Sequence, residues 1–327
     1  MHRRRAGAAI VAAAAFLAFA PLPAAAQAYP TKQPIRLIVP YAPGGPTDVL
    51  ARLIGQKLAE KMGATVIIEN RAGANSIIAT DYVVKSPADG YTLLIGSPAT
   101  AANISLYKKL PYDTLKDLSP VTPIASTPYF LIVSGNAPFN SVAELIAFAK
   151  AHPKDVSYAS AGAGGPLHLT AELFKLDAGV QMVHVPYKGV GPALLDVIAG
   201  RVQVIFAGLP ATKALIAEKK LKLLAVADRQ RTPFAPDVPA IREAGLANFS
   251  ADSWFGVFTP SGTPPAIENQ LATAVQAVLA QPDVRERMAD LGAVPLTSAP
   301  DQFKSYFRDE VKKWAAVIKA SGATLDE

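Results

Sequence analysis

The order of apolar patterns along this chain limits its fold more than any other property. Short apolar runs, which predict strands, alternate with segments in which apolar residues recur at helical spacing. Such alternation predicts a parallel sheet with helices packed on both faces. The pattern occurs in two sets, so the sequence predicts an α/β protein of two lobes. The first set has strands at 35–39, 66–68 and 91–95 and helices at 49–58 and 77–84; the second has strands at 130–133, 156–160, 182–185, 202–206 and 221–226 and helices at 142–150, 167–176 and 193–198.

The N-terminal segment has the features of a secretory signal peptide. Three consecutive arginines precede the uncharged run 6–20, and small residues follow up to Ala28. A transmembrane anchor is the alternative, but this run is shorter than the roughly 20 residues that cross a membrane. We therefore expect residues 1–28 to be a signal peptide cleaved after Ala28, with Ala26 as the other candidate site.

Charge and cysteine content exclude several classes of function. The 327 residues include 32 Lys and Arg against 26 Asp and Glu, a formal charge of +6. Removing the three arginines of the signal peptide leaves +3 on the mature chain. The remaining basic residues are scattered, so nucleic acid is not an expected partner. The absence of cysteine from the sequence excludes a thiol nucleophile, a disulfide scaffold, a thiolate zinc site and an iron–sulfur centre.

Two of the expected strands run into similar glycine-rich turns. The first turn reads Tyr-Ala-Pro-Gly-Gly-Pro at 41–46, and the second reads Tyr-Ala-Ser-Ala-Gly-Ala-Gly-Gly-Pro at 158–166. Glycine lets a ligand approach bare backbone, and proline at the first helical position removes only an N–H that has no helical partner. The other N–H groups at a helix start favour anions. We predict that two helix N-termini, one per lobe, face a common cleft as anion sites; for either turn alone, an ordinary tight turn is the alternative.

Asp48 lies in the first turn of the helix that follows the first glycine-rich turn. A carboxylate there stabilises the helix dipole. It would also lie at the mouth of an anion site, where an inward-pointing carboxylate would accept hydrogen bonds from a ligand and repel a second ligand carboxylate. Both interpretations stay open.

The mature chain contains no recognisable catalytic constellation. The turn at 162–167 lacks the third glycine of G-x-G-x-x-G, and no Walker A, H-E-x-x-H or G-x-S-x-G sequence occurs. His168 and Glu172 are spaced to share a metal, but one pair does not make a site, and a packed or capping histidine is the better interpretation. The sequence therefore predicts no enzyme activity, no cofactor and no metal.

Several motifs together resemble one family. They are Pro-Tyr-Ala-Pro-Gly-Gly-Pro-Thr-Asp at 40–48, Glu-Asn-Arg-Ala-Gly-Ala-Asn at 69–75, Asp-Gly-Tyr-Thr-Leu-Leu at 89–94, Leu-Pro-Tyr-Asp at 110–113, Tyr-Ala-Ser with its glycines from 158, His-Val-Pro-Tyr-Lys-Gly-Val-Gly-Pro-Ala at 184–193, Pro-Asp-Val-Pro at 236–239 and Pro-Ser-Gly-Thr-Pro at 260–264. The chain resembles the Bug or TctC family, the periplasmic solute-binding proteins of tripartite tricarboxylate transporters. Ser76 departs from the glycine found in many members.

The resemblance implies an α/β fold of the type 2 periplasmic-binding-protein class, in which two lobes close on a ligand like a Venus flytrap. It implies that the chain starts in one lobe, builds the second and returns. Lobe 1 would then comprise 29–126 plus 255–327, and lobe 2 would comprise 127–254. The helices expected within 264–319 would belong to lobe 1.

The resemblance also implies where a ligand binds. The family holds a ligand carboxylate with backbone N–H groups and small hydroxyls of the two glycine-rich loops. The loop at 97–99 and residues 207 and 208 should line the same cleft. The ligand-binding residues expected on this basis are Tyr41, Ala42, Pro43, Gly44, Gly45, Thr47, Asp48, Ser97, Pro98, Ala99, Ser160, Ala161, Gly162, Ala163, Gly164, Gly165, Tyr187, Ala207 and Gly208.

The function implied is capture of a small organic carboxylate in the periplasm for uptake by a tripartite tricarboxylate transporter. The ligand would be a di- or tricarboxylate, an aromatic carboxylate or an acidic amino acid. The partners would be the permease subunits in the membrane, and the binding protein itself is expected to be a monomer. A periplasmic sensor for a signalling partner is the alternative, and a secreted hydrolase or isomerase is a weaker one because no nucleophile–base pair is apparent.

Overall fold

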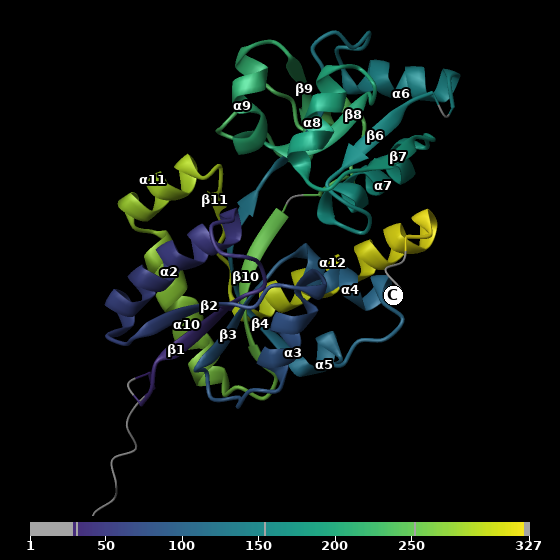
Figure 1. Cartoon of the computed structure of the whole chain (residues 1–327). Coiled ribbons are helices and arrows are strands. Elements are labelled where there is room, and N and C mark those ends of the chain that lie inside the picture. The colour runs from purple at the N-terminus through teal and green to yellow at the C-terminus, as the bar shows by residue number, and fades with distance from the viewer. Residues whose placement is uncertain (1–28, 31, 154, 252, 324–327) are drawn as a thin grey trace, which may run out of the picture.

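The computed structural model describes residues 29–30, 32–153, 155–251 and 253–323, so the expected signal peptide at 1–28 lies outside the described residues. Figure 1 shows two lobes, each built on its own sheet with helices packed around it. The predicted two-lobed α/β architecture is therefore confirmed. None of the helices within the described ranges is long and apolar enough to span a membrane.

The sheet of the first lobe has the strand order β11-β4-β10-β3-β1-β2 in the described part of the chain. Strand β1 pairs in parallel with β2 and β3. Strand β10 pairs antiparallel with β3 on one side and with β4 on the other, and β11 pairs antiparallel with β4. The strands are β1 (Ile35–Val39), β2 (Val66–Asn70), β3 (Thr92–Gly96), β4 (Leu118–Thr127), β10 (Ser253–Pro260) and β11 (Val294–Pro295).

The second sheet repeats this arrangement. Its order is β7-β6-β8-β5-β9, with β6 parallel to β7 and β8, and with β5 antiparallel to β8 and β9. Strands β1, β3 and β10 of the first lobe thus correspond to β6, β8 and β5 of the second. The strands are β5 (Tyr129–Ser134), β6 (Ser157–Ser160), β7 (Val183–Pro186), β8 (Val204–Gly208) and β9 (Leu221–Val226).

The predicted parallel pairing is found in part of each sheet, but both sheets also contain antiparallel strands and are therefore mixed. In the first lobe the antiparallel strand β10 separates the parallel strands from β4, a strand that the apolar pattern did not predict. Strand β4 contains Pro120 and Pro123, which cannot donate hydrogen bonds to a partner strand. The β4–β10 register shifts between Phe255 and Gly256 and again between Val257 and Phe258, and such irregularities are where a strand tolerates proline.

Helices cover both sheets (Figure 1). Helices α4, α5 and α9 were not predicted. The described helices, including the two short 3-10 turns, are α2 (Pro46–Met62), η2 (Ala74–Ser76), α3 (Ile77–Val84), α4 (Pro98–Leu106), α5 (Thr114–Asp117), α6 (Val142–Ala151), α7 (Pro166–Ala178), α8 (Val190–Ile198), α9 (Leu209–Ala217), η3 (Ile241–Ala244), α10 (Pro265–Leu279), α11 (Pro282–Asp290) and α12 (Pro300–Ser321).

The chain passes between the sheets at two places. Strand β4 of the first sheet ends at Thr127 and β5 of the second begins at Tyr129, with Pro128 between them. The chain returns where β10 begins at Ser253. The C-terminal helix α12 then packs on α4 and β4 of the first lobe and on α7 of the second.

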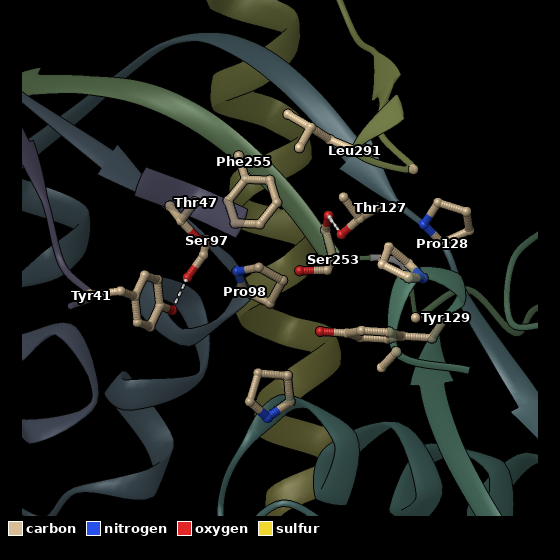
Figure 2. Close-up of a pocket in the computed structure, with 15 residues that line it drawn as sticks. Tyr41, Thr47, Ser97, Pro98, Thr127, Pro128, Tyr129, Ser253, Phe255 and Leu291 are labelled. Atoms are coloured by element: carbon tan, nitrogen blue, oxygen red, sulfur yellow. Dashed lines mark hydrogen bonds between the residues drawn. The ribbon is translucent and has the colours of Figure 1, made fainter. Parts of the chain in front are cut away.

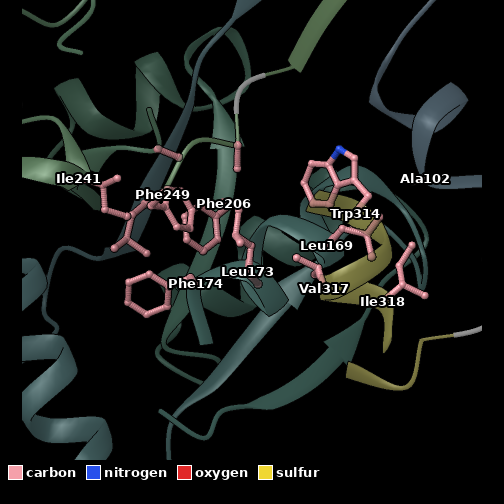
Figure 3. Close-up of a cluster of buried hydrophobic side chains, with 14 of the residues drawn as sticks. Ala102, Leu169, Leu173, Phe174, Phe206, Ile241, Phe249, Trp314, Val317 and Ile318 are labelled. Atoms are coloured by element: carbon pink, nitrogen blue, oxygen red, sulfur yellow. The ribbon is translucent and has the colours of Figure 1, made fainter. Parts of the chain in front are cut away.

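The buried core is continuous across the two lobes. Trp314, Val317 and Ile318 of α12 belong to the same apolar cluster as Leu169 and Leu173 of α7. Figure 3 shows these two groups of side chains facing each other. Helix α12 therefore packs against both lobes.

Candidate functional site

A cavity of about 310 Å³ lies between the two lobes (Figure 2). Its lining combines residues from both sheets and from both crossing segments. The lining residues are Tyr41, Thr47, Ser97, Pro98, Thr127, Pro128, Tyr129, Pro166, Gly208, Pro210, Ala211, Ser253, Phe255, Leu291 and Gly292.

Four of the described helices begin at this cavity. Helices α2 and α4 follow the adjacent parallel strands β1 and β3, and α7 and α9 follow the corresponding strands β6 and β8. Each of the four helices contributes a residue from its first turn to the lining. The positive ends of four helix dipoles therefore point toward one volume. The contributing residues are Thr47 of α2, Pro98 of α4, Pro166 of α7, and Pro210 and Ala211 of α9.

Proline supports this arrangement locally. Pro98 and Pro166 are the first residues of their helices, and Pro210 is the second residue of α9. At these positions the fixed proline backbone suits a helix start, and the missing N–H is one that has no acceptor within the helix. In α4 the helix start is further fixed because the Ser97 N–H donates to the Thr100 hydroxyl at 3.2 Å.

Hydroxyl groups supply the polar side chains of the lining. The Tyr41 hydroxyl and the Ser97 Oγ lie 2.9 Å apart and share a hydrogen bond. At the crossing segments, the Thr127 hydroxyl donates to the Ser253 carbonyl oxygen at 3.2 Å, which joins the ends of β4 and β10. Figure 2 shows both pairs and the Tyr129 hydroxyl pointing into the space between them.

Among the described residues that line the cavity, none carries a formal charge. The carboxylate of the first glycine-rich loop, Asp48, is buried, with 2% exposure. The hydrogen-bond donors to Asp48 all come from lobe one. A ligand in this cavity would therefore meet helix N-termini, hydroxyls and apolar walls.

The lobe-one loop, residues 41–48, is fixed by Asp48. Its Oδ2 accepts the Gly44 N–H and the Arg52 Nε–H, each at 2.9 Å, and its Oδ1 accepts from Asn70 at 2.8 Å. Hydrogen bonding to Arg52 foremost, and also to Gly44 and Asn70, lowers the pKa of Asp48 to about 2. Asp48 is thus an ionised carboxylate that holds the loop, and all of these bonds are within lobe one.

The lobe-two loop, residues 160–168, has the same backbone shape. Gly45 and Gly165 precede their helices at φ −75°, ψ 167° and φ −74°, ψ 168°, and Gly44 and Gly164 both have positive φ, at 84° and 69°. In lobe two the Gly164 N–H donates to His168 Nδ1 at 2.9 Å. His168 therefore occupies the place that Asp48 has in lobe one, as a neutral acceptor.

Two imidazoles stack on each other in lobe two, one from His168 at the end of the lobe-two loop and one from His184 of β7. The rings of His168 and His184 are 4.0 Å apart and 13° from parallel, and Tyr158 stacks on His184 at 4.9 Å. His184 Nε2 lies 2.7 Å from Ser160 Oγ, at the start of the loop. Burial is the main cause that lowers the pKa of His168. Burial, followed by the repulsion that a protonated His168 would exert, lowers the pKa of His184 to about 4. Both rings are therefore neutral at pH 7.

Glu172 completes this cluster without making a metal site. It accepts hydrogen bonds from the Tyr158 hydroxyl and, at 2.7 Å, from Lys175 Nζ. Its oxygen lies 3.9 Å from His168 Nε2. Within the described residues no group of three or more His, Asp or Glu side chains is arranged to hold a metal ion.

Some of the predicted ligand-binding residues line the cavity and others lie beside it. Residues 160–165 precede the lining residue Pro166, and their side chains or backbones are not among the described lining atoms. The same holds for residues 42–45, which precede Thr47. The predicted residues that line the cavity are Tyr41, Thr47, Ser97, Pro98 and Gly208.

Three further predicted residues, Ala99, Ala207 and Tyr187, are not among the lining residues of the cavity. Ala99 and Ala207 are buried, at 4% and 1% exposure. The Tyr187 hydroxyl donates to Asp196 Oδ2 at 2.6 Å, so this ring braces the turn before α8. The segment predicted as a loop at 97–99 instead begins helix α4, with Ser97 immediately before it.

Sequence reasoning missed the residues at the back of the cavity. Thr127, Pro128, Tyr129, Ser253 and Phe255 come from the crossing segments, which the sequence located without assigning them to the site. These residues could have been predicted to line the cleft, because they lie where the chain leaves and re-enters the first sheet. Leu291 and Gly292 follow α11, and no pattern in the sequence connected them with the cleft.

Comparisons with known proteins agree with this architecture. A family model described as the tripartite tricarboxylate transporter family receptor matches residues 50–323. The chain is 39% identical over 305 residues to protein BugT of Bordetella pertussis, covering 93% of each chain. It is 37% identical over 292 residues to a protein from the tcbD–tcbE intergenic region of Pseudomonas sp. (strain P51), covering 89% of this chain and 87% of that protein.

Solved structures with the same fold include two that carry ligands. Rpa4515 of R. palustris, solved with adipate, is 39% identical with a TM-score of 0.75, covering 91% of this chain and 100% of that one. MatC from Rhodopseudomonas palustris, solved with bound malate, is 33% identical with a TM-score of 0.70, covering 88% of this chain and 99% of that one. The fold is that of the two-lobed periplasmic binding proteins, and the chain belongs to the family of tripartite tricarboxylate transporter receptors.

Proposed function

We propose that this protein is a periplasmic receptor that binds a small organic carboxylate between its lobes and delivers it to the permease subunits of a tripartite tricarboxylate transporter. One observation carries the proposal: four described helix N-termini, two from each lobe, begin at one cavity whose described lining is uncharged. An anion is the ligand that such a site favours, because the first-turn N–H groups and the helix dipoles both stabilise negative charge.

The strength of such binding suits reversible capture. A charge-assisted hydrogen bond contributes roughly 1.5–3 kcal/mol. Three or four of them, less the free energy lost in ordering the ligand and closing the lobes, give about −8 kcal/mol, which corresponds to a micromolar dissociation constant. A receptor must also release its ligand, and an uncharged lining avoids a permanent ion pair that would slow release.

Binding and lobe closure are coupled in this proposal. The lining includes Tyr41 and Ser97 from lobe one and Pro166 and Gly208 from lobe two, so one ligand would contact both lobes. A ligand that makes both sets of contacts only in a closed form shifts the population toward that form. The two crossing segments, at Thr127–Tyr129 and before Phe255, are where the lobes would rotate.

The remaining parts of the proposal rest on the family and on the sequence. Relatives solved with adipate and with malate support a carboxylate as the ligand class. Export through a signal peptide at 1–28 follows from the sequence pattern. We further propose that the mature chain acts as a monomer and carries out no chemical step on its ligand.

The proposal is tested by binding measurements on mature protein that has been unfolded, dialysed and refolded to remove any co-purified ligand. A panel of mono-, di- and tricarboxylates and acidic amino acids is screened by thermal shift, and hits are titrated by calorimetry. We expect at least one carboxylate to bind with micromolar or tighter affinity. Failure of the whole panel to raise the melting temperature would contradict the proposal.

A further inference from the structure

We infer that helix α12 (Pro300–Ser321) positions the two lobes for the ligand, because its side chains form a third link between them besides the two crossing segments. This inference rests on the proposed function and adds the residues that govern how the lobes move. It is drawn from one apolar cluster and one buried ion pair, each of which joins residues of both lobes.

One of the three apolar clusters in the described part of the chain spans both lobes. The other two each stay within a lobe: one consists of lobe-one residues such as Val275, and the other consists of lobe-two residues. The third cluster includes Val317 of α12 and Leu169 of α7. Helix α12 packs on α4 of lobe one and on α7 of lobe two, so the lobes share buried apolar surface through this helix.

The shared cluster begins close to the cavity. Pro98 and Pro166, the first residues of α4 and α7, line the cavity. Ala102 of α4 and Leu169 of α7 follow them by about one helical turn and belong to the cluster that contains α12. Because a helix is stiff over one turn, a shift of α7 on α12 would move the α7 N-terminus relative to that of α4. The packing on α12 therefore sets the separation of two helix N-termini, one from each lobe.

A buried carboxylate on α12, Glu310, adds a polar contact to this link. It is 4% exposed, and its Oε2 accepts hydrogen bonds from Trp254 Nε1 of β10 at 2.8 Å and from Trp314 Nε1 at 3.0 Å. Glu310 also pairs with Lys313, whose Nζ donates to the Ser250 carbonyl oxygen at 3.0 Å. The pair thus contacts the chain before and after it returns to the first sheet.

The two contacted residues belong to different lobes. The Ser250 hydroxyl donates to Asp228 Oδ1 at 3.2 Å, and the Ala251 N–H donates to the Ala227 carbonyl oxygen at 3.0 Å. Ala227 and Asp228 directly follow β9 of the second sheet, whereas Trp254 lies in β10 of the first sheet. Moving the lobes apart at this point would disturb a buried ion pair, and a buried charge without its partner is strongly disfavoured.

The link affects binding through the arrangement of the lobes. The ligand binds protein in which both lobes face one volume, and the apparent dissociation constant rises as the fraction of protein in that arrangement falls. Val317, Glu310 and Lys313 are not among the described residues that line the cavity. Weakening the link should therefore reduce affinity without removing a ligand contact.

Distances between the lobes test the inference without a ligand. Since the sequence contains no cysteine, Gln56→Cys on α2 and Lys213→Cys on α9 provide two exposed labelling sites, one per lobe. In refolded, doubly spin-labelled mature protein, we expect Val317→Ala to make the distribution of label-to-label distances at least about 1.5 times as wide, measured by pulsed electron paramagnetic resonance. Val275→Ala is the matched control, because it truncates an equally buried valine within lobe one. Equal widths in the two variants, both shown to be folded by their melting curves, would overturn the inference.

The ion pair is tested in the same labelled protein. Glu310→Gln keeps an oxygen acceptor for the two indoles but loses the ionic attraction to Lys313. Glu268→Gln is the matched control, because Glu268 is also buried, with 5% exposure, and pairs with Lys304 inside lobe one. We expect a wider distribution in Glu310→Gln than in Glu268→Gln. The same width in both would overturn the role of Glu310.

Titration with adipate and with malate then connects the link to binding. We expect Val317→Ala to lose at least about threefold in affinity for whichever compound binds the parent protein, and Val275→Ala to lose no more than about 1.5-fold. A wider distance distribution with unchanged affinity would overturn the positioning role of α12. If neither compound binds the parent protein, the distances alone decide this inference, and the broader carboxylate panel decides the proposed function separately.

Discussion

The two glycine-rich loops share one backbone conformation but fix it with different chemistry. In lobe one the Gly44 N–H donates to the Asp48 carboxylate, and in lobe two the Gly164 N–H donates to the His168 imidazole, both at 2.9 Å. In both loops this glycine has positive φ, and its N–H donates to a side-chain acceptor four residues further along the chain, in the first turn of the helix. The acceptor is a carboxylate in lobe one and an imidazole in lobe two.

Because of this difference, the two lobes carry different charges behind their glycine-rich loops. Lobe one carries an ionised carboxylate behind its loop, balanced by Arg52, whose side chain is 52% exposed. Lobe two carries a neutral ring at the same place. The positive potential of the α7 N-terminus is therefore less compensated than that of α2, and we expect lobe two to be the stronger partner for a ligand carboxylate.

The largest effect is expected from removing the acceptor of lobe one. Asp48→Ala leaves the Gly44 N–H and the Asn70 amide without their buried acceptor and releases Arg52. We expect the free energy of unfolding, measured by urea denaturation, to fall by about 2–4 kcal/mol. As a control, Asp309→Ala removes an exposed carboxylate paired with Lys312. This substitution should change the free energy of unfolding by less than about 0.5 kcal/mol. Equal effects of the two substitutions would show that Asp48 does not hold the loop.

Making lobe two resemble lobe one should weaken ligand binding. His168→Asp would let a carboxylate accept the Gly164 N–H while adding a negative charge behind the loop. We expect carboxylate affinity to drop by about thirtyfold, or ~2 kcal/mol. His168→Asn keeps a neutral acceptor and should lose no more than about threefold. If calorimetry gives the two variants the same affinity, the charge at this position has no effect on the ligand.

As the pH is lowered, lobe two should lose stability at a higher pH than lobe one. The pKa of His184 is lowered from 6.5 to about 4, so the unfolded chain binds more protons in this range, and the stability present above pH 6.5 is lost as the pH falls toward 4. We expect a loss of about 1–2 kcal/mol, reduced by the partial exposure of the ring. Asp48, with its pKa lowered from 3.8 to about 2, contributes stability that is lost only below pH 3.8. His184→Gln should flatten the urea stability profile between pH 6.5 and 4; an unchanged slope would rule out this histidine as its cause.

The smallest effect is expected at the tyrosines. Tyr41→Phe removes the hydrogen bond to Ser97 at the cavity and should reduce carboxylate affinity by about two- to fivefold, or ~0.5–1 kcal/mol. Tyr187→Phe removes the bond to Asp196 outside the cavity and should leave affinity unchanged. Both variants are titrated with the same ligand. A larger loss of affinity in Tyr187→Phe than in Tyr41→Phe would contradict the placement of Tyr41 at the cavity and Tyr187 outside it.

The sequence predicted the parts of the fold that depend on local patterns. Strands such as Ile35–Val39 and helices such as Ile77–Val84 were predicted with their observed bounds, because their apolar periodicity reports burial directly. Strand β4 was missed because Pro120 and Pro123 argue against a strand, and only its irregular pairing with β10 accommodates them. Helix α9 begins at Leu209, between Gly208 and Pro210, and this short signal follows directly on the strong apolar pattern of β8.

The candidate site was less accessible from the sequence. The Ser97-Pro98 pair is a helix-start signal that could have identified α4. The equivalence of Asp48 and His168 is visible in the spacing of the two glycine-rich turns, but the hydrogen bonds that each accepts from a glycine N–H are seen only in the structure. Phe255 and Leu291 reach the cavity only through the long-range packing of β10 and α11, which no local pattern encodes.

The central claim is that helix N-termini, without a charged lining side chain, bind a carboxylate between the lobes. The most direct measurement is calorimetric titration with the tightest carboxylate found and with its neutral amide, which has nearly the same shape. We predict that the carboxylate binds at least about a hundredfold more tightly, or ~2.7 kcal/mol, because only the anion gains from the four helix dipoles. Equal affinities for the carboxylate and the amide would contradict the account.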